Sequence, residues 1–201
     1  LQQFIFSSET PPQPIFYCCL NALGQCKNIT VPEHIILQIK SLLHHDDVWY
    51  VPMDSMMTLS QLGVREAWFK QHLLDALDDP YGCDDLTPQG TSIEILTRWG
   101  NDGLYATDKI TQILQQAIQE NDQESVANLT IYMDAYPQLA THFQPMLWQW
   151  MAHLSTLPED ECWIEGKTMQ TFLLFFTYIT CQPTHAQWWS LQVFMEHVLE
   201  C

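Results

Sequence analysis

The chain has 201 residues, which corresponds to one or two domains, and 47% of them are hydrophobic. It carries 24 Asp and Glu against 7 Lys and Arg, so its formal net charge is −17, although only 15% of its residues are charged. This balance argues against a basic nucleic-acid-binding protein and against a polybasic protein of membrane surfaces. The 8 Trp, 9 Phe and 7 Tyr exclude a disordered acidic tail, so we expect a folded core.

The chain begins with a stretch that predicts an extended N-terminal arm over residues 1–14, because its prolines are incompatible with a regular helix. Residues 15–23 are apolar and predict a short helix that ends at Gly24. The next helix is expected to start at Thr30, whose hydroxyl can cap it. It should continue to about Leu43, on apolar residues at helical spacing.

The middle of the first half is less regular in sequence. The residues VWYV at 48–51 predict a strand-like segment. Ser60 is expected to cap a helix that continues to Leu77, and an acidic loop follows it. Ser92 is expected to start a short helix that ends at Trp99.

The second half of the chain is more clearly helical, after a turn predicted by the Gly and Asn residues of 100–103. Apolar residues at helical spacing predict five helices. They are expected over 107–120, from about Val126 to before Pro137, over 138–154, over 167–181, and after Thr184. Pro145 predicts a kink or a split in the third of them.

Runs of alternating polar and apolar residues are scarce, and the chain has only 7 Gly, which argues against a sheet-based fold. We therefore expect an all-α fold of about eight helices, stacked as irregular helical hairpins in a solenoid-like or bundle arrangement. Residues 15–201 are expected to form a single helical domain, with a subdivision near 100–106 as the alternative.

The 7 Cys are odd in number and scattered, so we expect reduced thiols in an intracellular protein, cytoplasmic or nuclear. The longest apolar run, residues 172–181, has about half of the ~20 residues that a membrane-spanning helix needs. We expect it to be a buried core helix. Because the sequence begins at Leu1 and not at Met, we expect it to be part of a longer or processed chain.

The motifs of catalysis and cofactor binding are missing from the sequence. It has neither a phosphate-binding loop nor a GxSxG motif. His44 and His45 are adjacent to two aspartates, but neighbouring residues on a helix point about 100° apart and do not share one ligand face. Cys83 lies among aspartates, which disfavour a reactive thiolate. We therefore expect no enzyme activity, no catalytic residue, no cofactor and no metal.

The acidic residues are concentrated in loops, with five of them at 75–85 and four at 159–165. In contrast, residues 135–158 and 168–195 contain no Asp, Glu, Lys or Arg. A helix on a protein surface normally carries charged residues on its outer face. Two explanations are open: these helices are central and buried on most sides, or a partner covers their outer faces.

Pairs of tryptophans in the uncharged segments bear on the second explanation. Neighbouring residues on a helix face different directions, so both members of such a pair are buried only in a wide contact. Tryptophan is also favoured at the centre of interfaces, so one of each pair is a candidate hot spot. The residues expected at a partner-binding surface are Trp148, Trp150, Trp188, Trp189, Phe194, Asp78, Asp79, Asp84 and Asp85.

Two functions agree with these features. The first is a non-enzymatic protein–protein interaction domain, an adaptor or scaffold subunit of a larger assembly. It would bind a protein partner or a second copy of itself through charge-free, Trp-rich helices, with the acidic loops steering the encounter. The alternative is an acidic inhibitor or decoy, of the toxin-neutralising, effector or DNA-mimic type, which its charge steers to a basic partner. Neither predicts direct binding to nucleic acid or to a membrane.

Overall fold

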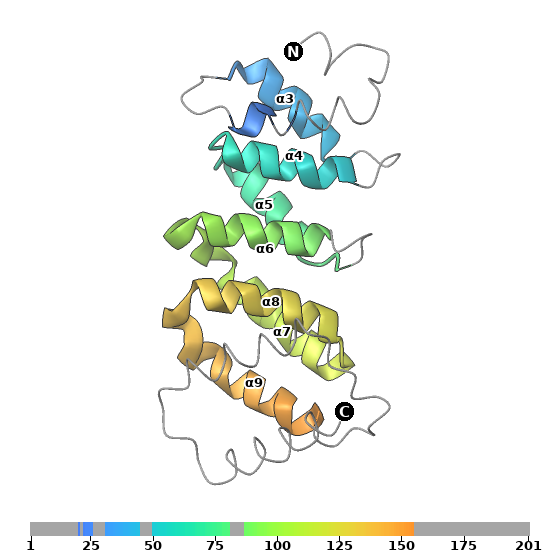
Figure 1. Cartoon of the computed structure of the whole chain (residues 1–201), viewed down its shortest axis with the longest axis vertical. Helices are drawn as coiled ribbons and strands as arrows, with labels where there is room; N and C mark the ends of the chain where they lie inside the picture. Colours follow the sequence, from blue (N-terminus) through green and yellow to red (C-terminus); the bar gives the residue numbers. More distant parts are fainter. Residues whose placement is uncertain (1–19, 21, 26–30, 45–49, 81–86, 155–201) are drawn as a thin grey trace. The chain divides into compact units, whose positions relative to one another are not determined.

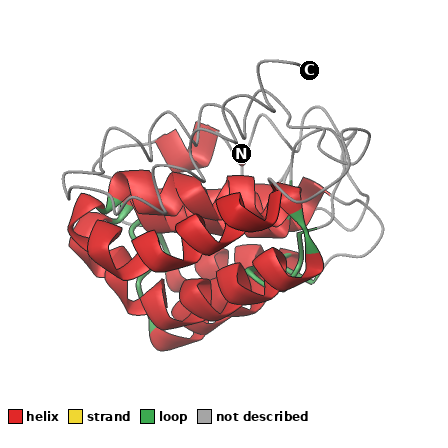
Figure 2. Cartoon of the chain, turned by 90° about the horizontal axis from the view of Figure 1, so that it is seen from below, coloured by secondary structure: helices red, strands yellow, loops and turns green. Residues whose placement is uncertain are grey.

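The computed structural model describes residues 20, 22–25, 31–44, 50–80 and 87–154 (Figure 1). Helices and their connections account for all of these ranges, and no strand occurs among them (Figure 2). The predicted all-α class is therefore confirmed. In the same part of the chain, no helix combines the length and the apolar character needed to cross a membrane.

The chain divides into two compact units, Leu1–Ile95 and Leu96–Cys201. The single domain expected over 15–201, and its alternative division near 100–106, stay predictions. The N-terminal arm at 1–14 and the helices expected over 167–181 and after Thr184 lie outside the described residues.

The first unit contains α3 (Glu33–Leu42), α4 (Tyr50–Gln61), α5 (Ala67–Ala76) and most of α6 (Pro88–Arg98). Helices α3 and α4 pack against each other and run in opposite directions (Figure 1). The core consists of large apolar side chains from all four helices, among them Ile35, Ile39, Met53, Met56, Leu59, Phe69, Leu73 and Ile93.

Helix α4 is largely enclosed, and even its hydroxyl-bearing residues Ser55, Thr58 and Ser60 are buried. Thr58 Oγ1 donates a hydrogen bond to the carbonyl oxygen of Leu20 at 3.3 Å. This bond ties α4 to the helical residues that precede α3 and satisfies a polar group inside the core.

Several predictions for this unit are wrong. The helix expected to end at Gly24 includes Gln25, and α3 starts at Glu33 after Pro32 and is not capped by Thr30. Tyr50 and Val51, which were expected in a strand-like segment, form the first turn of α4, because packing on several sides outweighs the β propensity of a short stretch. Ser60 lies inside α4 and does not cap the next helix, which starts after Glu66. Ser92 lies inside α6 and does not start it.

The second unit contains a 3-10 helix η1 (Gly100–Ala106), α7 (Thr107–Glu120), α8 (Gln123–Ala135), a short 3-10 helix η2 (Pro137–Leu139) and α9 (Ala140–Leu154). Helix α7 packs against both α8 and α9. The buried side chains between them include Ile110, Leu114, Val126, Leu129, Tyr132, Phe143, Leu147 and Met151.

The predicted end of α7 is confirmed, whereas α8 starts at Gln123 and not at about Val126. Asn121 ends α7 in the left-handed conformation with φ 56°, and the Asp122 side chain accepts a hydrogen bond from the Ser125 amide at 3.1 Å to cap α8. Helix α8 ends before Pro137, as expected. Pro145 lies within α9, so the predicted split at that residue is wrong.

Candidate partner-binding surface

Helix α9 makes up most of the described part of the uncharged segment 135–158, and it has buried and exposed residues. Its buried residues are Phe143, Leu147, Trp148, Trp150 and Met151. Trp148 is 7% exposed and Trp150 is fully buried. The chain itself therefore buries these two tryptophans. This agrees with the explanation that the uncharged helices are central and buried on most sides. Trp188, Trp189 and Phe194 lie outside the described residues.

The other side of α9 is exposed and carries no charge. It presents Thr141, Pro145, Gln149 and Ala152, which follow one another at the spacing of one helix face. Near the start of the same helix, the Thr111 hydroxyl lies 2.9 Å from His142 Nε2, and this hydrogen bond joins α9 to α7. We call the four residues the neutral face of α9.

A comparison with α7 shows what is unusual about the neutral face. Helix α7 is also exposed on one side, and it has Asp108 at its start and Glu120 at its end, both exposed. Charged groups on an outer face keep a surface helix hydrated. The neutral face of α9 lacks them, and depletion of charge is the compositional feature that distinguishes the centre of protein interfaces.

A second surface feature is the acidic turn after α5, which consists of Asp75, Asp78 and Asp79. All three are exposed. The Asp78 amide donates to the Asp75 carbonyl at 3.1 Å, and the Asp79 amide donates to the Ala76 carbonyl at 3.2 Å, so the chain continues as a tight turn. Asp84 and Asp85, also expected at the surface, lie outside the described residues.

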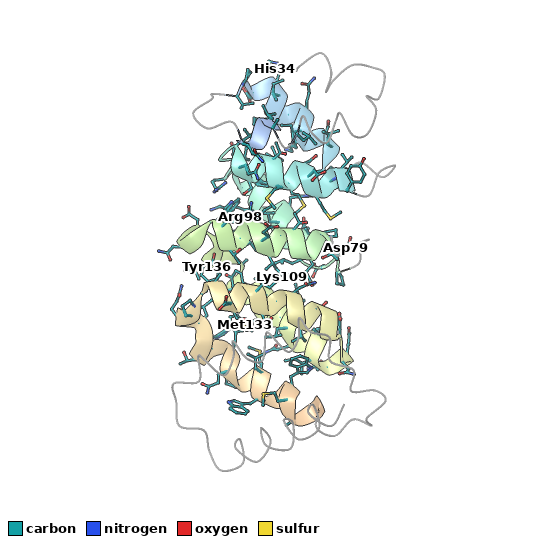
Figure 3. The ribbon with its side chains drawn as sticks, viewed as in Figure 1. His34, Asp79, Arg98, Lys109, Met133 and Tyr136 are labelled. Carbon is teal, nitrogen blue, oxygen red and sulfur yellow. The ribbon has the colours of Figure 1, made fainter. Side chains whose placement is uncertain are left out.

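Helix α6 fixes the backbone of the acidic turn from inside. Gln89 is 1% exposed, and its Nε2 donates to the Leu77 carbonyl at 3.0 Å while its amide donates to the Asp79 carbonyl at 3.0 Å. Ser92, also buried, donates through its hydroxyl to the Leu73 carbonyl at 2.7 Å. These donors satisfy carbonyls at the end of α5 that the helix itself leaves open. Figure 3 shows Asp79 beside the start of α6.

The electrostatics of the acidic turn are unfavourable for the fold. The end of a helix carries partial negative charge on its carbonyls, where cations stabilise and anions destabilise. Helix α5 has no basic residue in its last turn and three carboxylates in or just beyond it. An arrangement that opposes local stability is typical of a functional position.

Two titratable groups of the first unit, Asp54 and His72, have shifted pKa values. Neither is a member of the acidic turn or of the neutral face. Burial raises the pKa of Asp54, on α4, to about 6. Burial also lowers the pKa of His72, on α5, and the nearby His44 lowers it further. Within the described ranges, no group of three or more His, Cys, Asp or Glu side chains is placed to hold a metal ion.

Sequence analysis missed the residues that support the acidic turn. In the sequence, Gln89 and Ser92 resemble surface residues in a polar stretch. Their role depends on the carbonyl groups at the end of α5, which have no partner within that helix and accept hydrogen bonds from these two side chains. It also did not anticipate that Leu37 on α3 would be 56% exposed and Ile131 on α8 54% exposed.

Comparison of the chain with protein-family models, with curated proteins and with solved structures found no match in any of the three.

Proposed function

We propose that this chain is a non-enzymatic protein-binding domain, an adaptor or scaffold subunit of a larger assembly. The observation that supports the proposal is the neutral face of α9, an exposed helix surface without charged residues. The acidic turn after α5 supplies long-range attraction, and the uncharged helices of the second half supply the short-range contact.

The neutral face fits a partner surface of modest polarity. Gln149 and Thr141 offer hydrogen-bonding groups at the rim of such a contact, while Pro145 and Ala152 are small enough to allow close approach. The buried Trp150 lies away from this surface on the same helix, and the buried Trp148 follows Pro145 by three residues, so it borders the neutral face. Trp188, Trp189 and Phe194 stay predicted members of the surface.

Site-specific photo-crosslinking tests the proposal. A photoreactive amino acid at Gln149, on the neutral face, is expected to give a discrete crosslinked product in extracts of the cells that make the protein, identified by mass spectrometry. The same amino acid at Gln115, which is exposed on α7, is the matched control and is expected to give none. Equal product patterns from the two positions would contradict the proposal.

A charge-insertion variant gives a second measurement on the same surface. Gln149→Arg places a charge in the centre of the neutral face, and a charge buried without a counter-charge weakens binding. We expect loss of the crosslinked partner, whereas Gln115→Arg leaves it unchanged. Both positions are exposed, so far-ultraviolet circular dichroism should show the same helix content in both variants.

The second candidate function, an acidic inhibitor or decoy, is favoured by the exposed carboxylates of the acidic turn. In that case, binding depends on charge, and the affinity for a basic partner falls steeply above about 0.15 M salt. The double variant Asp78→Asn, Asp79→Asn should then weaken binding more than Gln149→Arg does. The reverse order of effects favours the adaptor.

A further inference from the structure

Two side-chain contacts one helical turn apart join α3 and the residue just beyond it to α5 in the first unit. Lys40 Nζ lies 4.2 Å from the centroid of the Trp68 ring. The rings of His44 and His72 have centroids 5.6 Å apart and planes at 87°. Because residue numbers rise in the same direction on both helices, α3 and α5 are parallel, and their carboxyl ends face the same side.

The two histidines have the separation of a metal chelate. Two imidazoles bound to one tetrahedral ion through bonds of about 2.0–2.1 Å have ring centroids roughly 5 Å apart. His44 is exposed, just beyond the end of α3, so its ring can rotate to aim a nitrogen at a shared ion. His72 is half-buried on a regular helix and supplies the fixed partner.

The electrostatic surroundings favour a cation at this place. His44 lies just beyond the carboxyl end of α3, where the partial negative charge of the helix end favours a cation. Asp75 acts electrostatically on His72, and its Oδ1 accepts a hydrogen bond from Gln71 Nε2 at 2.8 Å. Neutral imidazole is the form that binds metals.

We propose that His44 and His72 bind a divalent transition-metal ion of the zinc class, bridging the carboxyl end of α3 and the middle of α5. Imidazole nitrogen is a preferred ligand of Zn²⁺, Ni²⁺ and Cu²⁺. With two protein ligands, the ion keeps water in its other positions and is exchangeable. This site adjoins the acidic turn through Asp75, does not include residues of the neutral face, and does not depend on the proposed function.

Titration of the whole chain with Zn²⁺ alone, followed by isothermal calorimetry at pH 7, tests the proposal. We expect one ion per chain at this site. His44→Gln and His72→Gln each remove one proposed ligand. Each should lower the affinity for Zn²⁺ by at least roughly 10-fold, because replacing even a residue that only supports a metal ligand has an effect of that size. His34→Gln, exposed at the start of α3, is the matched control and should bind as the original chain does.

Nuclear magnetic resonance of the imidazole nitrogens identifies the ligands directly and does not depend on whether a variant is fully stable. On addition of Zn²⁺, the signals of His44 and His72 should shift together, and lowering the pH to about 5.5 should reverse the shift, because protonated imidazole does not bind metal. The proposal is overturned if His44→Gln and His72→Gln bind as tightly as the original chain. It is also overturned if the shifted signals belong to other histidines.

Discussion

Gly103 illustrates how one residue can control a packed turn. It is buried in η1, and the Tyr136 hydroxyl lies 2.6 Å from the carbonyl oxygens of both Leu96 and Gly100, to either of which it can donate. A Cβ atom at Gly103 would overlap the Leu96 carbonyl oxygen and the Tyr136 hydroxyl. The turn therefore requires glycine because of close approach, since the φ angle of Gly103 is not in the left-handed region.

We expect Gly103→Ala to lower the free energy of unfolding by about 1–3 kcal/mol, the usual effect of forcing extra atoms into a packed interior. Urea denaturation of the whole chain measures the change. Gly90→Ala is the matched control, because its Cβ would meet only the Thr87 hydroxyl, at 3.1 Å, which belongs to a side chain that can rotate. Equal destabilisation in both variants would show that the contact around Gly103 is unimportant.

Asp54 is a second residue whose surroundings set its chemistry. Its Oδ2 atom is buried and has no hydrogen-bond partner among the described residues, and burial raises the pKa to about 6 from 3.8. A raised carboxyl pKa means that the folded state favours the neutral form. The contribution of Asp54 to stability is therefore highest below pH 3.8 and declines as the pH rises toward 6.

We expect Asp54→Asn to raise the free energy of unfolding at pH 7 by about 1–2 kcal/mol, less than the whole pKa shift implies because the side chain keeps some contact with water. At pH 4 the two proteins should be almost equally stable. Denaturation midpoints at both pH values test this. Glu94→Gln, exposed on α6, is the control and should change the free energy of unfolding at pH 7 by less than Asp54→Asn does. A benefit that is the same at pH 4 and pH 7 would contradict the interpretation.

At the scale of the helix, the pairing of α5 with α6 depends on buried polar side chains as well as on apolar packing. Gln89 and Ser92 donate to carbonyls at the end of α5, and both are almost completely buried. Removing a donor leaves a buried carbonyl without a partner, which destabilises more than the hydrogen bond itself contributes.

We expect Gln89→Ala to lower the free energy of unfolding by about 1–3 kcal/mol and to increase amide hydrogen exchange in the acidic turn. Gln71→Ala is the control, because the hydrogen bond from Gln71 to Asp75 is exposed and contributes little. Exchange measured residue by residue distinguishes local loosening from global destabilisation. An unchanged exchange rate at Asp78 and Asp79 would show that Gln89 does not hold the turn.

For the chain as a whole, the net charge of −17 is the dominant physical property. Mutual repulsion among carboxylates opposes the compact state, and salt screens it. We expect the melting temperature to rise as the salt concentration increases from about 0.01 to 0.15 M, over which the screening length falls from about 30 to 8 Å. Calorimetry in NaCl and KCl measures this.

The two salts should act equally, because screening depends on ionic strength and not on the identity of the ion. The double variant Asp78→Asn, Asp79→Asn is the comparison, and its melting temperature should depend less on salt because it carries fewer negative charges. A melting temperature that falls with added salt would contradict the idea that charge repulsion limits stability.

Prediction from sequence succeeded where short-range chemistry acts. Asn121 ends α7 through its left-handed backbone, and Pro137, which has no amide hydrogen, follows the end of α8, although α9 continues through Pro145. It failed where packing outweighs local preference. Tyr50 and Val51 became helical, and Ser60 was enclosed within α4. Of the residues expected at a partner surface, Asp78 and Asp79 are exposed while Trp148 and Trp150 are buried.

The sequence by itself determined the all-α class, several helix ends and the separation of acidic loops from uncharged segments, because these depend on composition and on neighbouring residues. Only the tertiary structure decided which sides of the helices are covered. The sequence places Trp150 on a helix but does not say whether its side chain faces the core of the protein or a partner. Its burial is decided by how that helix packs against the rest of the chain. For the same reason, the alignment of His44 with His72 and the support of the acidic turn by Gln89 appear only when separate helices pack together.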